Sequence, residues 1–333
     1  MSVFIIAEVG QAHDGSLGIL HSYIDAVAET GVDAIKFQTH IAEAESSQFE
    51  PFRVKFSYED KTRYEYWKRM EFSLDQWKEI KRHCDGVKLM FMSSPFSNAA
   101  VSILEEVGVS KYKIGSGEVT NLLLLEKVAK TGKEIILSSG MSSLRELDET
   151  INFLRPFGNS ISILQCTTQY PTSPENVGLN VIKEMKKRYN CPVGLSDHSG
   201  TVYPSLAAVA LGAELVEVHV VFDKRMFGPD SPSSLILDEL KQMVDGVRFI
   251  ATSLGNKVDK NDNSKFTALK SMFEKSLAVN KALKKDHIIT FDDLEAKKPS
   301  GYGLPPQRYK EVIGKRLKNA KTQYDFIKED DLR

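Results

Sequence analysis

Two short stretches place histidine and carboxylate side chains at the ends of strongly apolar segments. VGLSDHSG carries Ser196, Asp197 and His198, and LVEVHVV carries Glu217 and His219. A single histidine on a strand is more often structural than a metal ligand, but two on consecutive strands favour ligation. Neighbouring strands lie about 4.8 Å apart, so both imidazoles can reach one ion and still leave positions for substrate and water. We expect Asp197 and Glu217 to orient these two ligands.

Lysines and hydroxyl residues stand at the ends of other apolar runs. Lys36 and Lys113 would each cost several kcal/mol if they were buried without a partner. With nearby Ser and Thr hydroxyls they predict a cradle for a phosphate or carboxylate; the alternative is internal salt bridges with Glu8 and Glu118. The residues alone therefore predict a metal-assisted enzyme acting on a phosphorylated or carboxylated small molecule, without fixing its reaction. The full strand-end set is Glu8, Lys36, Gln38, Ser93, Ser94, Lys113, Ser116, Glu118, Thr167, Thr168, Ser196, Asp197, His198, Glu217 and His219.

Apolar β-rich runs alternate with amphipathic stretches along most of the chain. This alternation predicts a parallel sheet covered by helices, and eight units in about 250 residues favour a (β/α)8 TIM barrel. The carboxyl ends of the strands meet at one mouth of such a barrel, where the active site lies. A doubly wound open sheet is the second choice, because no glycine-rich dinucleotide fingerprint follows the first run. The runs are 4–10, 34–39, 88–94, 111–116, 134–140, 161–168, 193–199 and 215–221.

The pattern changes in two places. Residues 44–78 are too long for an ordinary strand-to-helix loop and mix aromatic and charged residues, which predicts either a surface excursion or a lid. Residues 1–255 are expected to form the barrel, 256–270 a linker, and 271–333 a small β-rich domain.

Composition excludes several classes of function. The net charge of −1 does not favour nucleic acid, and acidic residues within 44–78 offset the basic ones there. No segment approaches 18 consecutive apolar residues, so a membrane span is not expected. Three cysteines are too few for a disulfide framework and indicate a cytoplasmic protein.

Several sequence blocks, in order, resemble the sialic acid synthase family, whose members make N-acetylneuraminate and related nonulosonic acids. The tail KSLAVNKALKKDHIITFDDLEAKKPSGYGLPP is similar to that family's C-terminal antifreeze-like (SAF) domain. Together the blocks cover nearly the whole chain. They are AEVGQAHDGS, IKFQTH, SSPF, KIGSGE, CTTQYPT, GLSDH, VALGA, EVH and GPD.

The resemblance implies a reaction and a set of roles. Members condense phosphoenolpyruvate with an N-acetylated amino sugar, by default N-acetylmannosamine, and release phosphate. A divalent metal, commonly Mn²⁺ with Mg²⁺ or Co²⁺ as alternatives, would be held by His198 and His219. Catalytic roles fall to Glu118, Glu8 and Asp230. Positions matched to substrate binding are Lys36, Ser94, Lys113, Ser116, Thr168, Tyr170, Ser196, Glu217 and Lys298.

The resemblance also implies a domain-swapped homodimer, in which the small domain closes the partner's barrel. The chain departs from the family pattern at Lys298, where members usually carry an arginine that meets the sugar's N-acetyl group. Lysine lacks the planar fork of arginine, so the identity of the sugar stays open. Alternatives are a legionaminic or pseudaminic acid synthase acting on a diacetamido-6-deoxyhexose, a deoxy-keto acid phosphate synthase, and a non-catalytic carbohydrate- or ice-binding protein.

Overall fold

A computed structural model of the chain describes residues 2–54, 56 and 58–333. The chain divides into two compact units, Met1–Lys257 and Val258–Arg333, and each has a hydrophobic core of its own. None of the helices within the described residues combines the length and the apolar character needed to cross a lipid bilayer.

The first unit is a closed barrel. In its described residues, eight parallel strands form a ring because β1 pairs with both β2 and β8, and a short β9 continues from β8. The predicted (β/α)8 barrel is confirmed, and each of the eight predicted runs overlaps one strand. The strands are β1 Phe4–Gly10, β2 Ala34–Thr39, β3 Met90–Pro95, β4 Lys111–Ile114, β5 Glu134–Ser138, β6 Ile161–Cys166, β7 Val193–Asp197, β8 Leu215–Val221 and β9 Leu235–Ile236.

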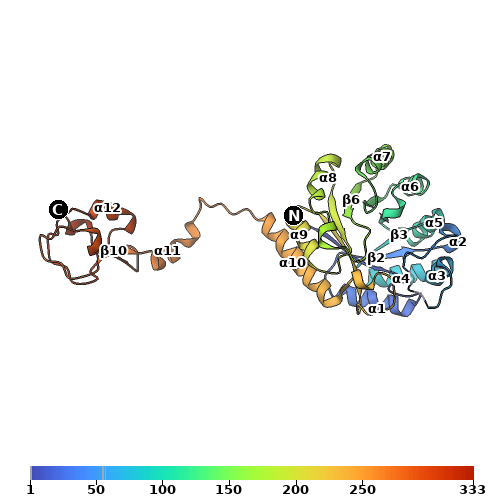
Figure 1. Ribbon diagram of the computed structural model, residues 1–333, viewed down its shortest axis with the longest axis horizontal. Helices are drawn as coiled ribbons and strands as arrows, with labels where there is room; N and C mark the ends of the chain where they lie inside the picture. The colour runs from blue at the N-terminus through green and yellow to red at the C-terminus, as the bar shows by residue number, and fades with distance from the viewer. Residues whose placement is uncertain (1, 55, 57) are drawn as a thin grey trace. The chain divides into compact units, whose positions relative to one another are not determined.

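Helices surround the strands on the outside of this barrel (Figure 1). Capping boxes begin several of them: the side chains of Thr62, Ser73 and Ser143 each accept a hydrogen bond from a backbone N–H of the first turn. The helices are α1 Leu17–Ala28, α2 Ala42–Glu45, α3 Arg63–Met70, α4 Leu74–Gly86, α5 Asn98–Val107, α6 Leu122–Ala129, α7 Leu144–Leu154, α8 Val181–Tyr189, α9 Tyr203–Ala210 and α10 Leu237–Gly255. Short 3₁₀ turns are η1 Ser116–Glu118, η2 Arg155–Phe157, η3 Pro174–Asn176 and η4 Ser231–Ser233.

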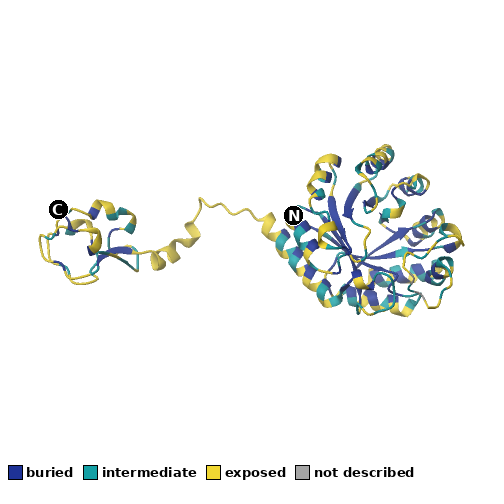
Figure 2. Cartoon of the chain, viewed as in Figure 1, coloured by how far each residue is buried: buried dark blue, intermediate teal, exposed yellow. Residues whose placement is uncertain are grey.

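The interior of the barrel changes from apolar to polar toward the carboxyl ends of the strands. An inner apolar layer consists of Ile6, Ala34, Met92, Ile136, Leu164 and Leu215. Side chains two residues apart on a strand point to the same face. The next inward position on the same strands is therefore occupied by Glu8, Lys36, Ser94, Ser138, Cys166 and Glu217. The strands are buried along nearly their whole length (Figure 2), so this polar layer lies deep in the mouth of the barrel.

Gly194 on β7 keeps the inner apolar layer packed. A Cβ atom there would lie 2.2 Å from the Leu215 carbonyl oxygen and 2.7 Å from a methyl carbon of Leu164. Only glycine lets β7 approach its two neighbours this closely. The polar residue two positions later, Ser196, is thereby brought to the same level as the other inward polar side chains.

The long segment after β2 folds onto the barrel rather than extending from it. It contains α2 and α3, and Ala42 of α2 is buried in a small core with Tyr66, Trp67 and Met70 of α3. Arg69 ties the segment to the loop after β1, because its guanidinium donates to the Asp14 carboxylate at 2.6 Å. Within its described residues, this segment supplies one wall of the barrel mouth.

The second unit is small and rich in turns. Its two-stranded antiparallel sheet pairs β10 with β11, and isolated bridges join it to the last residues of the chain. The residues of α11 are exposed. The elements are η5 Ser264–Phe266, α11 Thr267–Phe273, β10 Ser276–Val279, η6 Phe291–Asp293, β11 Leu294–Lys297, η7 Pro306–Arg308, α12 Tyr309–Val312 and η8 Glu329–Asp331.

Asp293 is the main buried charge of the second unit, with 2% of its surface exposed. Its carboxylate accepts hydrogen bonds from the backbone and the hydroxyl of Thr290 and from His287 Nε2, each at 2.8 Å, and pairs with Lys281 at 2.9 Å. Burial alone would raise the pKa of Asp293, but these donors hold it well below the usual range for a carboxyl group. The carboxylate thus joins three turns of this unit.

Candidate active site

A cavity of about 470 Å³ opens at the carboxyl ends of the barrel strands. Of the strand-end side chains singled out from the sequence, Ser93, Thr167 and Asp197 lie outside its walls. Its walls bring together thirteen of the fourteen side chains to which the resemblance assigns a role. The exception is Lys298, which belongs to the second unit, where its ammonium group lies 4.7 Å from the centre of the Phe273 ring. The thirteen are Glu8, Lys36, Ser94, Lys113, Ser116, Glu118, Thr168, Tyr170, Ser196, His198, Glu217, His219 and Asp230.

Both buried lysines are paired with carboxylates at the floor of the cavity. Lys36 forms an ion pair with Glu8 on the neighbouring strand, and its ammonium also donates to Ser94 Oγ at 3.2 Å. Lys113 donates to Glu217 Oε1 at 2.7 Å. Glu217 lies 4.0 Å from Lys36 as well, so the four charges form one connected group.

The expected salt-bridge partner of Lys113 was wrong. The predicted alternative paired the lysines with Glu8 and Glu118, but Lys113 pairs with Glu217 instead. Glu118 lies on η1, after β4 has ended, and forms no ion pair with this group among the described residues. Its carboxylate accepts a hydrogen bond from the Asn121 amide nitrogen at 2.6 Å. Burial raises the pKa of Glu118, the Asn121 hydrogen bond opposes that rise, and the nearby Glu45 charge adds to it.

The charges around Glu217 outweigh its burial. Burial by itself would raise the pKa of this carboxyl, but Lys113 and Lys36 lower it to about 2. Ser196 Oγ donates a further hydrogen bond to the same carboxylate at 3.1 Å. Glu217 is therefore an anion that pairs with Lys113 and lies near Lys36, and its described hydrogen bonds do not orient a histidine as the sequence suggested.

The two histidines face each other across the end of the barrel, with ring centres 5.3 Å apart. His198 Nδ1 lies 3.0 Å from the Thr167 carbonyl oxygen, to which it can only donate, so its Nε2 carries the lone pair. Burial and the neighbouring His219 lower the pKa of His198 to about 3, which keeps the ring neutral. Asp197 was expected to orient a histidine but instead binds Ser199, at 3.0 Å to its N–H and 2.8 Å to its hydroxyl.

This donor set fits a divalent metal ion. A neutral imidazole with its other nitrogen donating to a carbonyl is the usual arrangement of a metal-bound histidine. The described residues contain no cluster of three or more His, Cys, Asp and Glu side chains suited to a metal. A metal held by His198 and His219 would therefore take its remaining ligands from water and substrate.

A hydroxyl group cluster lies beside the lysines. Ser116 Oγ accepts a hydrogen bond from the backbone N–H of Gly140 at 3.0 Å. A Cβ atom on Gly140 would stand 2.5 Å from that oxygen and 2.3 Å from Thr168 Oγ1, so glycine is required for both hydroxyls to be here. Ser138 Oγ is buried and finds no hydrogen-bond partner in the described part of the chain. It is available to a ligand.

The opposite wall comes from the segment after β2 and from the loop after β8. Arg53 donates to Asp230 at 2.8 Å, and its guanidinium lies 4.1 Å from the centre of the Tyr170 ring. Tyr170 in turn stacks on His198 with ring centres 4.1 Å apart. This chain of contacts links Arg53 of the 44–78 segment to the histidines, so the described part of the segment borders the cavity.

Sequence reasoning missed part of the cavity wall. Gln38, Ser138 and Cys166 lie at strand ends and were detectable by position, although only Gln38 was noted there. The others belong to loops or to α2, α3 and η1, which lie outside the strand pattern used for the prediction. The additional residues are Gln11, Gln38, His40, Glu45, Glu50, Arg53, Arg63, Trp67, Phe96, Gly115, Gly117, Ser138, Met141, Cys166 and Pro229.

Comparisons with known proteins agree with this geometry. The family model described as "NeuB family" matches residues 23–259. The N,N'-diacetyllegionaminic acid synthase of Campylobacter jejuni is 35% identical over 98% of this chain and 98% of its own length. The human N-acetylneuraminate-9-phosphate synthase is 34% identical over 98% of this chain and 92% of its own length.

A solved structure extends the likeness to three dimensions. The N-acetylneuraminic acid (sialic acid) synthetase of Leptospira borgpetersenii superposes with a TM-score of 0.71 at 31% identity, covering 81% of this chain and 91% of that one. The predicted resemblance to the sialic acid synthases is confirmed by these matches. From the matched model and from relatives one-third identical along almost its whole length, the chain belongs to the NeuB family.

Proposed function

We propose that this chain condenses phosphoenolpyruvate with the open-chain form of an N-acylated amino sugar, releasing phosphate and forming a sialic acid-type nonulosonic acid. The observation that carries this proposal is the convergence of two lysines, several hydroxyls and two histidines in one cavity. The names of the relatives supply the product class, because they are synthases of legionaminic and N-acetylneuraminic acids. N-acetylmannosamine is the first sugar to test.

The floor of the cavity suits phosphoenolpyruvate. An ammonium group has three donors, and Lys113 uses only one of them on Glu217. The remaining donors, together with the unpartnered Ser138 hydroxyl and those of Ser116 and Thr168, can bind the phosphate and carboxylate oxygens. Lys113 and Ser138 stand on strands, and Ser116 and Thr168 lie two residues beyond strand ends, an arrangement that would hold the anion with little reorganisation.

The balance of charge supports a requirement for a metal cation. Six carboxyl groups and four Lys or Arg side chains line the cavity. A multiply charged anion is therefore not attracted by the protein alone, and a divalent ion would reverse the sign of the local field. Bound by His198 and His219, such an ion, for which we propose Mn²⁺, would supply Lewis-acid polarisation of the aldehyde oxygen.

The chain's own residues account for the remaining chemistry. The C3 carbon of phosphoenolpyruvate forms a bond to the aldehyde carbon as the C2–C3 double bond is used up, and the aldehyde oxygen takes up a proton to become a hydroxyl. Water adds at the cationic C2 and loses a proton. The C2–O bond to phosphate then breaks, and phosphate leaves with the bridging oxygen. We assign the exchange of the water proton to Glu118, which lines the cavity and whose carboxyl pKa is raised by burial, a shift that favours a general acid or base. Glu8 and Asp230 also line the cavity, and we assign their roles to the reaction of the sugar.

A substrate panel tests this function. The folded, full-length protein is incubated with Mn²⁺, phosphoenolpyruvate and one sugar at a time, and phosphate release is measured. The panel contains N-acetylmannosamine, its 6-phosphate, and acetamido and diacetamido 6-deoxyhexoses. We expect release with at least one sugar and loss of release when the metal is chelated. No release with any sugar, or release that does not depend on sugar, would overturn the proposal.

A further inference from the structure

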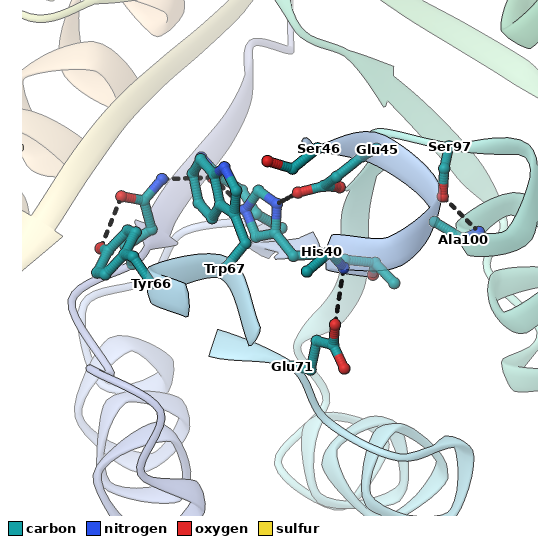
Figure 3. A network of polar contacts seen from close by, with 12 residues as sticks. His40, Glu45, Ser46, Tyr66, Trp67, Glu71, Ser97 and Ala100 are labelled. Carbon is teal, nitrogen blue, oxygen red and sulfur yellow. Dashed lines mark hydrogen bonds and ion pairs between the residues drawn. The ribbon is translucent and has the colours of Figure 1, made fainter. Parts of the chain in front are cut away.

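His40 and Glu45 form a buried pair in the cavity wall that the proposed chemistry leaves without a role. The imidazole of His40 is stacked between Trp67 and Phe96, with ring centres 4.0 Å and 4.7 Å away and planes within 20° and 11° of parallel. Its Nδ1 lies 2.7 Å from Glu45 Oε1 (Figure 3). Both side chains line the cavity, and only 2% and 7% of their surfaces are exposed.

The hydrogen-bond network fixes which nitrogen of His40 carries a proton. Tyr66 donates to Gln11 Oε1 at 2.9 Å, so the amide nitrogen of Gln11 faces Gln38 Oε1, at 3.0 Å. The amide nitrogen of Gln38 donates to Glu8 Oε1 at 2.9 Å, which sets Gln38 in the same orientation. Gln38 Oε1 therefore faces His40 Nε2, at 3.0 Å. A carbonyl oxygen only accepts, so Nε2 bears hydrogen.

The hydrogen-bond network around His40 also determines what Glu45 can offer to a ligand. One proton must lie between His40 Nδ1 and Glu45 Oε1, on either atom, because two lone pairs at 2.7 Å would repel. In both arrangements the second oxygen, Oε2, holds only lone pairs. That oxygen is buried and has no hydrogen-bond partner among the residues the structure describes. Since no described donor satisfies it, this oxygen is an acceptor open to a donor from a ligand.

Glu45 is held in this position from both ends of its short helix. The backbone N–H of Ala42, the first residue of α2, donates to Glu71 Oε1 at 2.7 Å (Figure 3). At the other end, His40 binds the Glu45 carboxylate and is clamped by Trp67, whose own indole N–H donates to Glu50. The free oxygen is therefore placed by packed side chains and not by a loose surface loop.

We propose that Glu45, backed by His40, is a further substrate-contacting residue, whose free Oε2 accepts a hydrogen bond from a hydroxyl or amide N–H of the acceptor sugar. Phosphoenolpyruvate in its ionised form has no such donor and would be repelled by a carboxylate, so the sugar is the matching ligand. This inference rests on the proposed function and assigns part of its sugar specificity to α2.

Three variants of the full-length protein test the inference. Glu45→Met removes the acceptor and keeps the side-chain length, whereas Glu45→Gln can direct its N–H to His40 and leave an oxygen toward the sugar. Glu43→Met is the matched control on the same helix, because Glu43 is exposed, lies outside the cavity and has Lys68 as its nearest cation at 3.6 Å. Kinetics use the sugar that the wild-type protein turns over fastest.

We expect Glu45→Met to raise KM for the sugar roughly ten- to hundredfold, the effect of leaving a polar group of the substrate unpaired, with KM for phosphoenolpyruvate unchanged. Glu45→Gln should raise the sugar KM by only about threefold, because it restores an acceptor. Sugar analogues that lack single hydroxyl or amide donors then identify the partner. For one analogue, the KM of the wild-type protein should rise to the value that Glu45→Met shows with the complete sugar.

The outcomes separate this inference from the proposed function. A wild-type protein that releases phosphate with none of the sugars overturns the proposed function, and the sugar contact falls with it. An active wild type whose Glu45→Met variant keeps its sugar KM overturns the inference alone. A variant in which KM for both substrates rises equally also overturns it, because that pattern indicates a structural role for Glu45.

Discussion

The ion pair between Lys113 and Glu217 offers a way to separate stability from function at the cavity floor. In Lys113→Met, Glu217 stays buried with its negative charge, and its remaining partners are Ser196 at 3.1 Å and Lys36 at 4.0 Å. Removing one partner of a buried pair costs about 3–5 kcal/mol. Because Lys36 compensates in part, we expect the free energy of unfolding to fall by about 3 kcal/mol, the lower end of that range.

The double variant Lys113→Met/Glu217→Gln removes the stranded charge. We expect it to recover about 2 kcal/mol of the loss, because replacing both partners of a buried ion pair costs much less than leaving one of them unpaired. Urea unfolding followed by tryptophan fluorescence measures this. Both tryptophans of the chain, Trp67 and Trp77, lie in the first unit, so the signal reports the barrel alone.

Activity should not recover with stability. The double variant still lacks the ammonium group of Lys113, so KM for phosphoenolpyruvate should stay at least tenfold above wild type, about 1.4 kcal/mol of lost binding. Two results would refute the reasoning. One is a double variant whose destabilisation equals the sum of the two single effects, and the other is a double variant with wild-type affinity for phosphoenolpyruvate.

Three further variants address the metal, the hydroxyl cluster and the second unit. His219→Ala should keep the fold but lose Mn²⁺-stimulated phosphate release, and unchanged turnover would remove His219 from the site. Gly140→Ala should displace the hydroxyls of Ser116 and Thr168 and raise KM for phosphoenolpyruvate roughly tenfold while the sugar KM stays constant; a wild-type value in a folded variant would contradict this. Asp293→Asn should destabilise the second unit by about 2–3 kcal/mol at pH 7, measured by amide hydrogen exchange in the full chain. Since the folded-state pKa of Asp293 is depressed, its contribution is present above the unfolded pKa of about 4 and is lost as pH falls, so equal protection of wild type and variant at pH 7 would refute its role.

The barrel could be predicted from the sequence because its strands carry their own signal. Runs such as residues 34–39 and 215–221 are apolar, β-branched and separated by amphipathic helices, and the observed strands have the same limits. Strand ends converge in any such barrel, so residues as distant in sequence as Glu8 and His219 could be assigned to one mouth. The structure shows these two residues in register on neighbouring strands.

Pairing within the site could not be predicted in the same way. Whether Lys113 pairs with Glu118 or with Glu217 depends on the register of the strands and on where β4 ends. Neither can be read from the local sequence. The wall formed by Arg53 and Glu45 depends on how a long irregular segment packs, which periodicity does not describe. The network around His40 joins side chains from separate segments of the chain, so no single stretch of sequence predicts it.

The central claim is that a metal held by the histidines and phosphoenolpyruvate held by the lysines occupy one cavity at the same time. Phosphorus NMR of phosphoenolpyruvate bound to the Mn²⁺-loaded protein tests it directly, because the paramagnetic ion broadens a phosphate signal only at short range. We expect strong broadening in the wild-type protein and little in His219→Ala. A sharp phosphate signal from a sample in which both ligands are shown to be bound would contradict it.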